Sequence, residues 1–249
     1  MTALVRAELA KIRTLRSTWV LVALAAVFCA GWTTSAVLVF DATPQAVALP
    51  AAERLAAIYR MGQQGYLAAL LLGVFGMTGE YRHQTITWTF LQSPVRRRVL
   101  VAKAAAHALF GLGIGLLGVA VTTGTAAVLL SSAGRVVFTA QVPAILAGCV
   151  LSTAGYALLG LAIGTLVRNQ AAAVAVAFGW FYYGEYLLAA FLPVVGRWLP
   201  TGAAKALIGD QAVTGGELLP VWAGAAVFLG YVVVIGGAAQ VLTLRRDVT

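Results

Sequence analysis

Long apolar runs recur along the chain and are separated by short polar segments. The runs cover residues 19–40, 62–78, 99–130, 141–167, 171–192 and 219–244. About 20 apolar residues are needed for one α-helix to cross the hydrocarbon core of a bilayer, and each run is near or above that length. The pattern therefore predicts an all-α integral membrane protein, with six transmembrane helices in a single domain that covers residues 1–249.

The basic residues are distributed unevenly between the two sides that six spans would define. If the N-terminus is cytoplasmic, the outer side holds only five of the 17 Lys and Arg residues: Arg54, Arg60, Arg135, Arg197 and Lys205. Lys and Arg concentrate in cytoplasmic segments, so both termini are expected in the cytoplasm. The same rule explains the net charge of +9, and no basic, aromatic-rich module typical of nucleic-acid binding is present. We expect no nucleic-acid partner.

The N-terminal segment has an amphipathic pattern. At 100° per residue one face collects the apolar residues Leu4, Val5, Leu9, Ile12, Leu15 and Trp19. Glu8 and Arg16 fall on this face, whereas Arg6, Lys11 and Arg13 lie off it. This pattern predicts an interfacial helix, with Arg6, Lys11, Arg13 and Arg16 at the inner headgroup layer of the lipid. An ordinary positively charged flank of the first span is the alternative.

Two longer connections are expected on the outer side. Residues 41–61 contain the helix-like stretch AAERLAAIYR, and residues 193–218 are interrupted by Pro193, Pro200 and Gly202. Residues 199–208 are apolar but too few to cross a bilayer. We expect a re-entrant or surface helix there, before the last span.

Motifs for catalysis are missing from the sequence. Lys11, Lys103 and Lys205 are the only lysines, and none has the preceding Gly and following Ser or Thr of a phosphate-binding loop. His83 and His107 are far apart and lack metal-ligand spacing, and Cys29 and Cys149 sit singly in apolar runs as small core residues. The chain is therefore expected to bind no metal or cofactor and not to be an enzyme.

Glu185 is the one acidic residue deep inside an apolar run, and we assign the other seven acids to surfaces. An ionisable group at membrane depth is costly and usually faces protein or water. Glu185 with Tyr182 and Tyr183 is a candidate substrate path or proton site. The alternative is a structural hydrogen bond to a Tyr or a neighbouring helix, with the aromatic residues forming an outer belt.

Residues 79–103, GEYRHQTITWTFLQSPVRRRVLVAK, form the cytoplasmic connection between the second and third spans. This stretch resembles the type-2 ATP-binding-cassette (ABC) exporter permeases, in which a Glu is followed by a Gly-Thr pair, a Leu-x-x-Pro step, basic residues and a Lys. Glu80, Thr85, Leu91, Pro94, Arg96 and Lys103 match that pattern, and Gln84 stands at the Gly position. LVRAELAKIRTLRSTW (4–19) also resembles the interfacial helix of this family, and RWLPTGAAKAL (197–207) resembles its outer connection.

The resemblance implies a permease subunit of a bacterial plasma-membrane exporter, paired with a second permease copy or a sister subunit. A separate ATPase subunit would bind ATP and Mg and would contact a coupling helix at about residues 85–94. The coupling loop would involve Glu80, Arg82, Thr85, Pro94, Arg96 and Lys103, with Glu80 paired to Arg82 or to an N-terminal arginine. Arg96, Arg97 and Arg98 would meet acidic ATPase residues or lipid headgroups. A stand-alone secondary transporter or channel, or a membrane-embedded enzyme, are the alternative functions, and the substrate is not identified.

Overall fold

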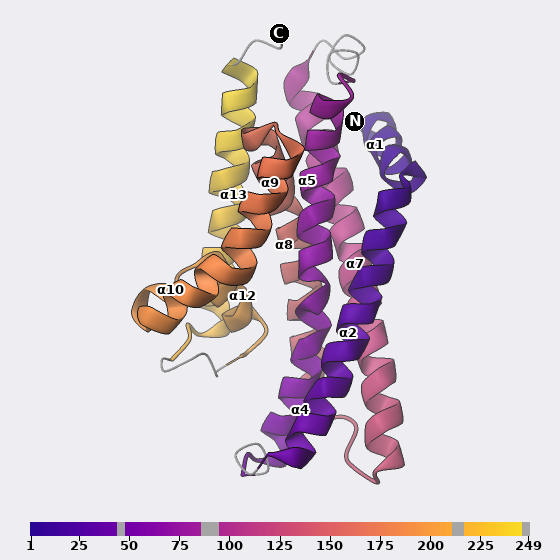
Figure 1. Ribbon diagram of the computed structural model, residues 1–249, viewed down its shortest axis with the longest axis vertical. Helices are drawn as coiled ribbons and strands as arrows, with labels where there is room; N and C mark the ends of the chain where they lie inside the picture. Colours follow the sequence, from indigo (N-terminus) through magenta and orange to yellow (C-terminus); the bar gives the residue numbers. More distant parts are fainter. Residues whose placement is uncertain (44–47, 86–94, 211–216, 246–249) are drawn as a thin grey trace.

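The computed structural model describes residues 1–43, 48–85, 95–210 and 217–245, and the regular structure in these residues is helical (Figure 1). The N-terminal half contains α1 (Thr2–Thr14), α2 (Arg16–Ala42), α4 (Ala51–Arg60), the 3₁₀ helix η1 (Met61–Gly65), α5 (Tyr66–Arg82) and α7 (Arg96–Ser132). The C-terminal half contains α8 (Val142–Val167), α9 (Gln170–Phe178), the π-helix η2 (Gly179–Gly184), α10 (Glu185–Phe191), α11 (Pro193–Gly196), α12 (Pro200–Leu207) and α13 (Val221–Arg245).

Five helical stretches in the described residues are long and apolar enough to cross a membrane. They are Arg16–Val39, Arg97–Ser132, Val142–Val167, Gln170–Phe191 and Val221–Thr243. The predicted second span forms α5, which has 17 residues and is about 26 Å long at 1.5 Å per residue. This is shorter than the hydrocarbon core of about 30 Å. The chain is a multi-pass membrane protein with five candidate spans, and α5 is a shorter sixth helix beside them.

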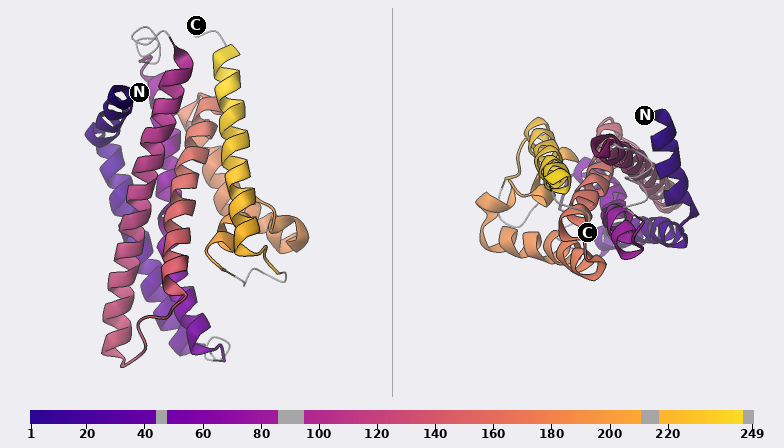
Figure 2. Two further views of the ribbon diagram at one scale, coloured as in Figure 1. Left: turned by 180° about the vertical axis from the view of Figure 1, so that it is seen from behind. Right: turned by 90° about the horizontal axis from the view of Figure 1, so that it is seen from above.

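The N-terminus and the end of α13 lie at the same end of the bundle, in agreement with the prediction that both termini are on one side. Figure 1 shows α1, the end of α5, the start of α7 and the end of α13 together at the top, with α4 at the opposite end. Figure 2 shows the same arrangement from behind. The helix-like stretch 51–60 is α4, as expected.

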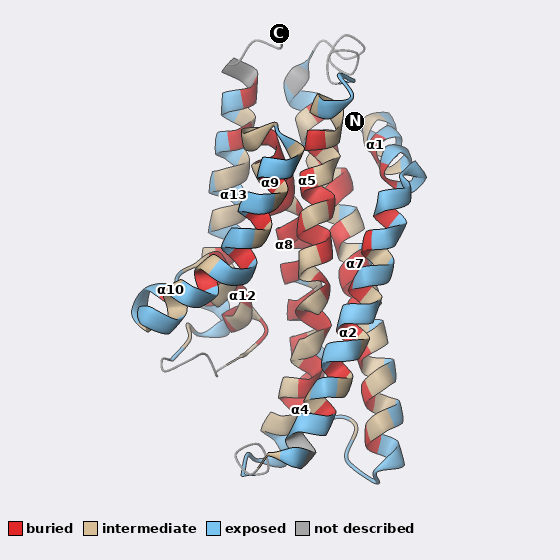
Figure 3. Ribbon diagram, viewed as in Figure 1, coloured by how far each residue is buried: buried red, intermediate tan, exposed pale blue. Residues whose placement is uncertain are grey.

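The centre of the bundle is α8, which packs against α5, α7 and α13 (Figure 3). Small residues bring these helices close together. A Cβ atom on Gly160 would overlap the carbonyl oxygen of Leu70 in α5, and one on Gly111 would lie 2.9 Å from the Cα atom of Ala154 in α8. The two G-x-x-x-G pairs, 111/115 and 160/164, therefore pack within the chain.

Outward faces of the long helices carry large apolar side chains. Trp19 and Val27 on α2, and Trp222 and Val233 on α13, are more than half exposed in the isolated chain. Such faces are expected where lipid replaces water around a helix bundle.

The fifth apolar run is not one continuous α-helix. It divides into α9, η2 and α10, and Figure 1 shows α10 turned away from the bundle. The residues predicted as a re-entrant or surface helix form α12, whose Ala203, Ala204 and Ala206 are buried. Gly224 of α13 approaches α12 closely, since a Cβ atom on it would lie 2.6 Å from that of Ala206. The helix expected here is confirmed, and it packs against protein.

Candidate functional site

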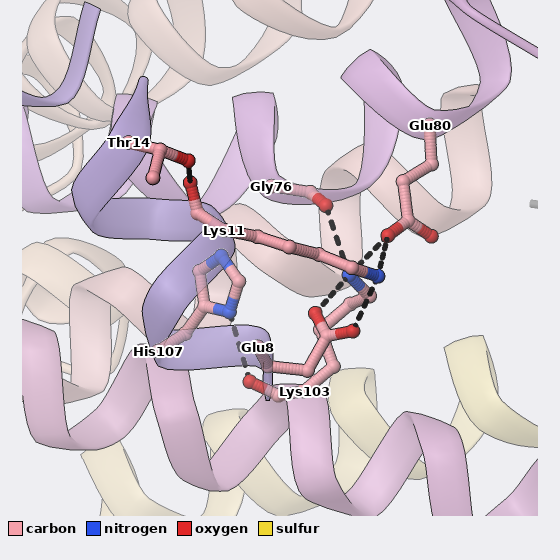
Figure 4. Close-up of polar contacts among 7 residues, drawn as sticks. All are labelled: Glu8, Lys11, Thr14, Gly76, Glu80, Lys103 and His107. Atoms are coloured by element: carbon pink, nitrogen blue, oxygen red, sulfur yellow. Dashed lines mark hydrogen bonds and ion pairs between the residues drawn. The ribbon is translucent and has the colours of Figure 1, made fainter. Parts of the chain in front are cut away.

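Four charged side chains from three helices converge at the end of the bundle that holds the N-terminus and the end of α13 (Figure 4). Lys103 Nζ on α7 lies 2.5 Å from Glu8 Oε2 on α1 and 2.9 Å from Glu80 Oε1 on α5. Lys11 Nζ on α1 lies 2.7 Å from Glu8 Oε1 and 3.0 Å from the same Glu80 oxygen. Two ammonium groups and two carboxylates thus balance in charge. We call these four residues the charge cluster.

The centre of the charge cluster is enclosed by protein. Lys103 is 2% exposed and Glu8 is 4% exposed, whereas the Lys11 side chain is 46% exposed. Removing a charge from water costs several kcal/mol unless it is paired and hydrogen-bonded. Lys103 Nζ meets both carboxylates and also donates to the Gly76 carbonyl oxygen at 3.3 Å. The buried ammonium group is therefore fully satisfied, and loss of either acid would leave it under-compensated.

The sequence pattern of α1 explains why Glu8 points inward. Val5, Leu9 and Ile12 pack into an apolar cluster with residues of α2, α5 and α7, and Glu8 lies on the same face. Leu15, with extended backbone, ends α1 before α2 begins. An acid on the apolar face of a helix that packs on protein must be buried, so it needs cations as partners.

Burial by itself would raise the pKa of the Glu8 carboxyl group, but the ammonium groups of Lys103 and Lys11 outweigh it and hold that pKa below 4.5. Burial by itself would lower the pKa of Lys11, but the carboxylates of Glu8 and Glu80 raise it above 10.5. Both groups therefore stay charged through the neutral pH range. Glu80 sits at the C-terminal end of α5, where the helix dipole disfavours an acid, so it too gains from the lysines.

His107 extends the cluster by one helical turn along α7. Its Nδ1 lies 2.8 Å from the Lys103 carbonyl oxygen, and this contact requires Nδ1 to carry the hydrogen. The imidazole is 1% exposed, and Nε2 has no hydrogen-bond partner. A Cβ atom on Gly76 would overlap this ring, so Gly76 makes room for it.

The residues predicted for the coupling loop divide into several groups. Glu80 and Lys103 come together. The predicted pairing of Glu80 with Arg82 or an N-terminal arginine is wrong, because Glu80 forms its ion pairs with Lys11 and Lys103. Lys11 reaches Glu80 from α1, which packs on α7, and Lys103 reaches it from α7 itself. Arg82 Nη1 instead donates to Gln170 Oε1, at the start of α9, at 3.1 Å.

The turn after α5 leads toward the expected coupling helix. Gln84 has φ 54°, a left-handed conformation that glycine adopts without strain and that matches the Gly position of the resembled pattern. Thr85 is exposed at the end of the described segment. Pro94 and the expected helix at 85–94 fall almost entirely outside the described residues. Arg96 is the first residue of α7, and its side chain is not described.

Two sequence-based assignments near the N-terminus change. Arg6, Lys11 and Arg13 lie on α1 as predicted, but Arg16 is the first residue of α2, because Leu15 separates the two helices. The assignment of Glu8 to a surface is wrong, since this carboxylate is buried. The position of Glu8 on the apolar face was the signal that could have identified it.

A second buried polar group lies at Glu185, on the first turn of α10. This residue is 2% exposed, and its Oε2 accepts a hydrogen bond from the Thr201 backbone amide, at the start of α12, at 2.6 Å. The expectation of a hydrogen bond to a neighbouring helix is thus confirmed. Tyr182 and Tyr183 are exposed, and their rings pack on Phe178.

Comparison with protein-family models finds no match to this chain, and comparison with curated proteins finds no significant relative. What is shown is therefore a helical, multi-pass membrane protein with a buried charge cluster at one end.

Proposed function

We propose that this chain is the membrane-spanning permease subunit of an ATP-driven exporter of the ABC type, in a bacterial plasma membrane. ATP and Mg would be bound by a separate ATPase subunit, because the chain has no phosphate-binding loop of its own. The proposal rests on the resemblance of three segments, residues 4–19, 79–103 and 197–207, to this family. It also rests on the charge cluster.

The proposed topology counts α5 as the sixth span and places both termini in the cytoplasm. Helix α5 lies at the lower limit for a spanning helix, and η1 adds a turn at its outer end. A permease of this type would work with a second copy or a sister subunit, so that the route for substrate lies between two bundles.

The position of the charge cluster is the observation that carries the proposal. Glu80 is near the end of α5 and Lys103 is in the second turn of α7, on either side of the predicted coupling helix. Glu8 joins α1, the predicted interfacial helix, to both. Separating these groups would leave buried charges unpaired, which is strongly unfavourable.

The cluster therefore provides a rigid connection between two predicted contact points for an ATPase and the membrane-spanning helices. Coupling between distant sites requires an element that both sites bias. Movement of the coupling helix or α1 by an ATPase would be transmitted to α5 and α7 together. Arg97 and Arg98 are exposed at the start of α7, where they would contact acidic ATPase residues or anionic lipid headgroups.

A stand-alone secondary transporter or channel is the alternative. Such a protein would carry ionisable groups and broken helices near the middle of the bilayer. Glu185 and the break at η2 fit that description. The charge cluster does not, because its balanced ion pairs lie at the end of the bundle.

Co-purification distinguishes the two functions. The tagged full-length chain is isolated from its native membrane in mild detergent, and the associated proteins are identified by mass spectrometry. We expect a P-loop ATPase in stoichiometric amount, and its recovery should not change in Glu53→Gln, which alters an acid on α4 at the opposite end. Recovery of the chain alone from membranes, after mild cross-linking, would contradict the proposal.

A further inference from the structure

The break in the fifth apolar run places Glu185 directly after the π-helical turn η2. Its side chain reaches the first turn of α12, where Oε2 accepts the Thr201 amide hydrogen at 2.6 Å. Tyr156 of α8 is also directed there, with its hydroxyl group 3.3 Å from Thr201 Oγ1. The carboxyl group thus joins α10 to α12 at a point enclosed by protein.

The second oxygen of this carboxyl group, Oε1, is buried and has no hydrogen-bond partner. The Trp180 indole, the Thr201 hydroxyl and the Lys205 ammonium group also lie near the carboxyl group and stabilise its anion. None of them reaches Oε1 with hydrogen-bond geometry. Among the described residues, no cation forms an ion pair with Glu185, although six such pairs occur elsewhere.

An ionised carboxylate is unfavourable in these surroundings. A buried charge without a counter-ion usually becomes neutral by taking up or releasing a proton. The positive N-terminal end of α12 favours the anion, but this helix has eight residues and gives the carboxylate one amide hydrogen. The unpartnered oxygen is where the proton of a neutral carboxylic acid would reside.

The other ionisable groups around Glu185 come from several elements. They are Tyr66 of α5, Tyr156 of α8, Tyr182 of η2 and Lys205 of α12, and Tyr231 of α13 packs against the same apolar cluster. A tyrosine has no cationic form, so none of these tyrosines can act as a counter-ion for the carboxylate. Lys205 is the one cation in this set, and it lies beyond ion-pair distance.

We propose that Glu185 is a proton-binding site whose occupancy controls the contact between its carboxyl group and the start of α12. In the packed arrangement the proton resides on Oε1, and Oε2 accepts the Thr201 amide hydrogen. When α12 separates and water enters, the proton passes to a water molecule and leaves a hydrated carboxylate. The backbone permits this movement, because the bend at Leu192 and Pro200 interrupt the helix between Glu185 and Thr201.

Infrared difference spectroscopy on the full-length protein in liposomes tests proton binding directly. Spectra of the wild type are recorded from mildly acidic to alkaline pH and compared with those of Glu185→Gln and of Glu53→Gln. We expect a protonated-carboxyl band that disappears as the pH rises, is missing in Glu185→Gln and is retained in Glu53→Gln. Absence of this band at every pH, or its persistence unchanged throughout, would overturn the proposal.

Hydrogen–deuterium exchange, measured on the same proteins, tests whether protonation of Glu185 controls the position of α12. In the wild type, the amide exchange rate of residues 200–207 should rise several-fold at alkaline pH relative to the rate in α4. In Glu185→Gln this ratio should not change with pH. A rise of equal size in both proteins would show that Glu185 does not control α12. The wild-type infrared titration decides proton binding even if the variant fails to fold.

Discussion

Lys103 lies on a candidate membrane-spanning helix, and the surrounding protein encloses its charged side chain almost completely. Its ammonium group is stable there because Glu8 and Glu80 arrive from two other helices. Removal of one partner from a buried pair typically costs about 3 to 5 kcal/mol, whereas replacing both partners with apolar or neutral groups is often nearly neutral.

A double-mutant cycle at Glu8 and Lys103 tests this balance. Glu8→Gln leaves an excess positive charge, and Lys103→Met leaves an excess negative charge, so each should destabilise the protein by about 3 kcal/mol. The double variant keeps Lys11 paired with Glu80 and should lose clearly less than the sum of the two. The measurement is denaturant unfolding in micelles, and strict additivity would contradict a direct interaction.

The pH dependence of stability should follow from the same groups. Because the pKa of Glu8 is lowered, its contribution to stability is complete above about pH 4.5 and is lost as the pH falls through the lower folded-state pKa. The pKa of Lys11 is raised above 10.5, so its contribution is lost only as the pH rises beyond that value. Thermal unfolding of the wild type should therefore show a loss of stability at acidic pH that is smaller in Glu8→Gln. Parallel pH curves for the two proteins would exclude Glu8 as a cause.

At the level of the helices, close approach between α7 and α8 depends on which glycines face the contact. A Cβ atom on Gly111 would meet Ala154 and Ala157 at under 3.0 Å, whereas one on Gly113 would have nothing within 4 Å. Both substitutions to Ala gain about 1 kcal/mol of helix propensity. We expect Gly113→Ala to match or exceed the wild type in melting temperature and Gly111→Ala to fall below it. Equal melting temperatures would mean that the two helices are not packed as described.

The apolar pattern was sufficient to predict most helices. It identified α2, α7, α8 and α13 as spans, and its breaks at Pro193 and Pro200 indicated the short helix α12. The division of the fifth run at η2 was not predictable, because a π-helical turn leaves the apolar periodicity intact. The short α5 was read as an ordinary span, because the length of an apolar run does not show where the 3₁₀ turn ends and the α-helix begins.

The candidate site was only partly predictable for a related reason. Glu80 and Lys103 belong to one recognisable segment, but their partner Glu8 is about 70 residues away from Glu80 in the chain and was read as a surface acid. Spacing along one helix shows which face a residue occupies, and does not show whether that face meets lipid, water or another helix.

At the level of the whole molecule, the ion pairs of the charge cluster connect α1, α5 and the start of α7 into one rigid unit. Helix α13 reaches the same end of the bundle and makes no such ion pair in its described residues (Figure 1). If an ATPase acts on this end, the unit should move as one body relative to α13.

If the proposed ATPase co-purifies with the chain, distances between spin labels in that complex test this claim most directly. One label pair joins α1 to α7 (Arg6→Cys with Val101→Cys), a second joins α1 to α13 (Arg6→Cys with Val241→Cys), and the buried Cys29 and Cys149 are replaced by Ala. When ATP binds, we predict an unchanged α1–α7 distance and a shifted α1–α13 distance, and in Lys103→Met the α1–α7 distribution should broaden. A wild-type α1–α7 distance that shifts as much as the α1–α13 distance, or no shift of either on ATP binding, would contradict the account.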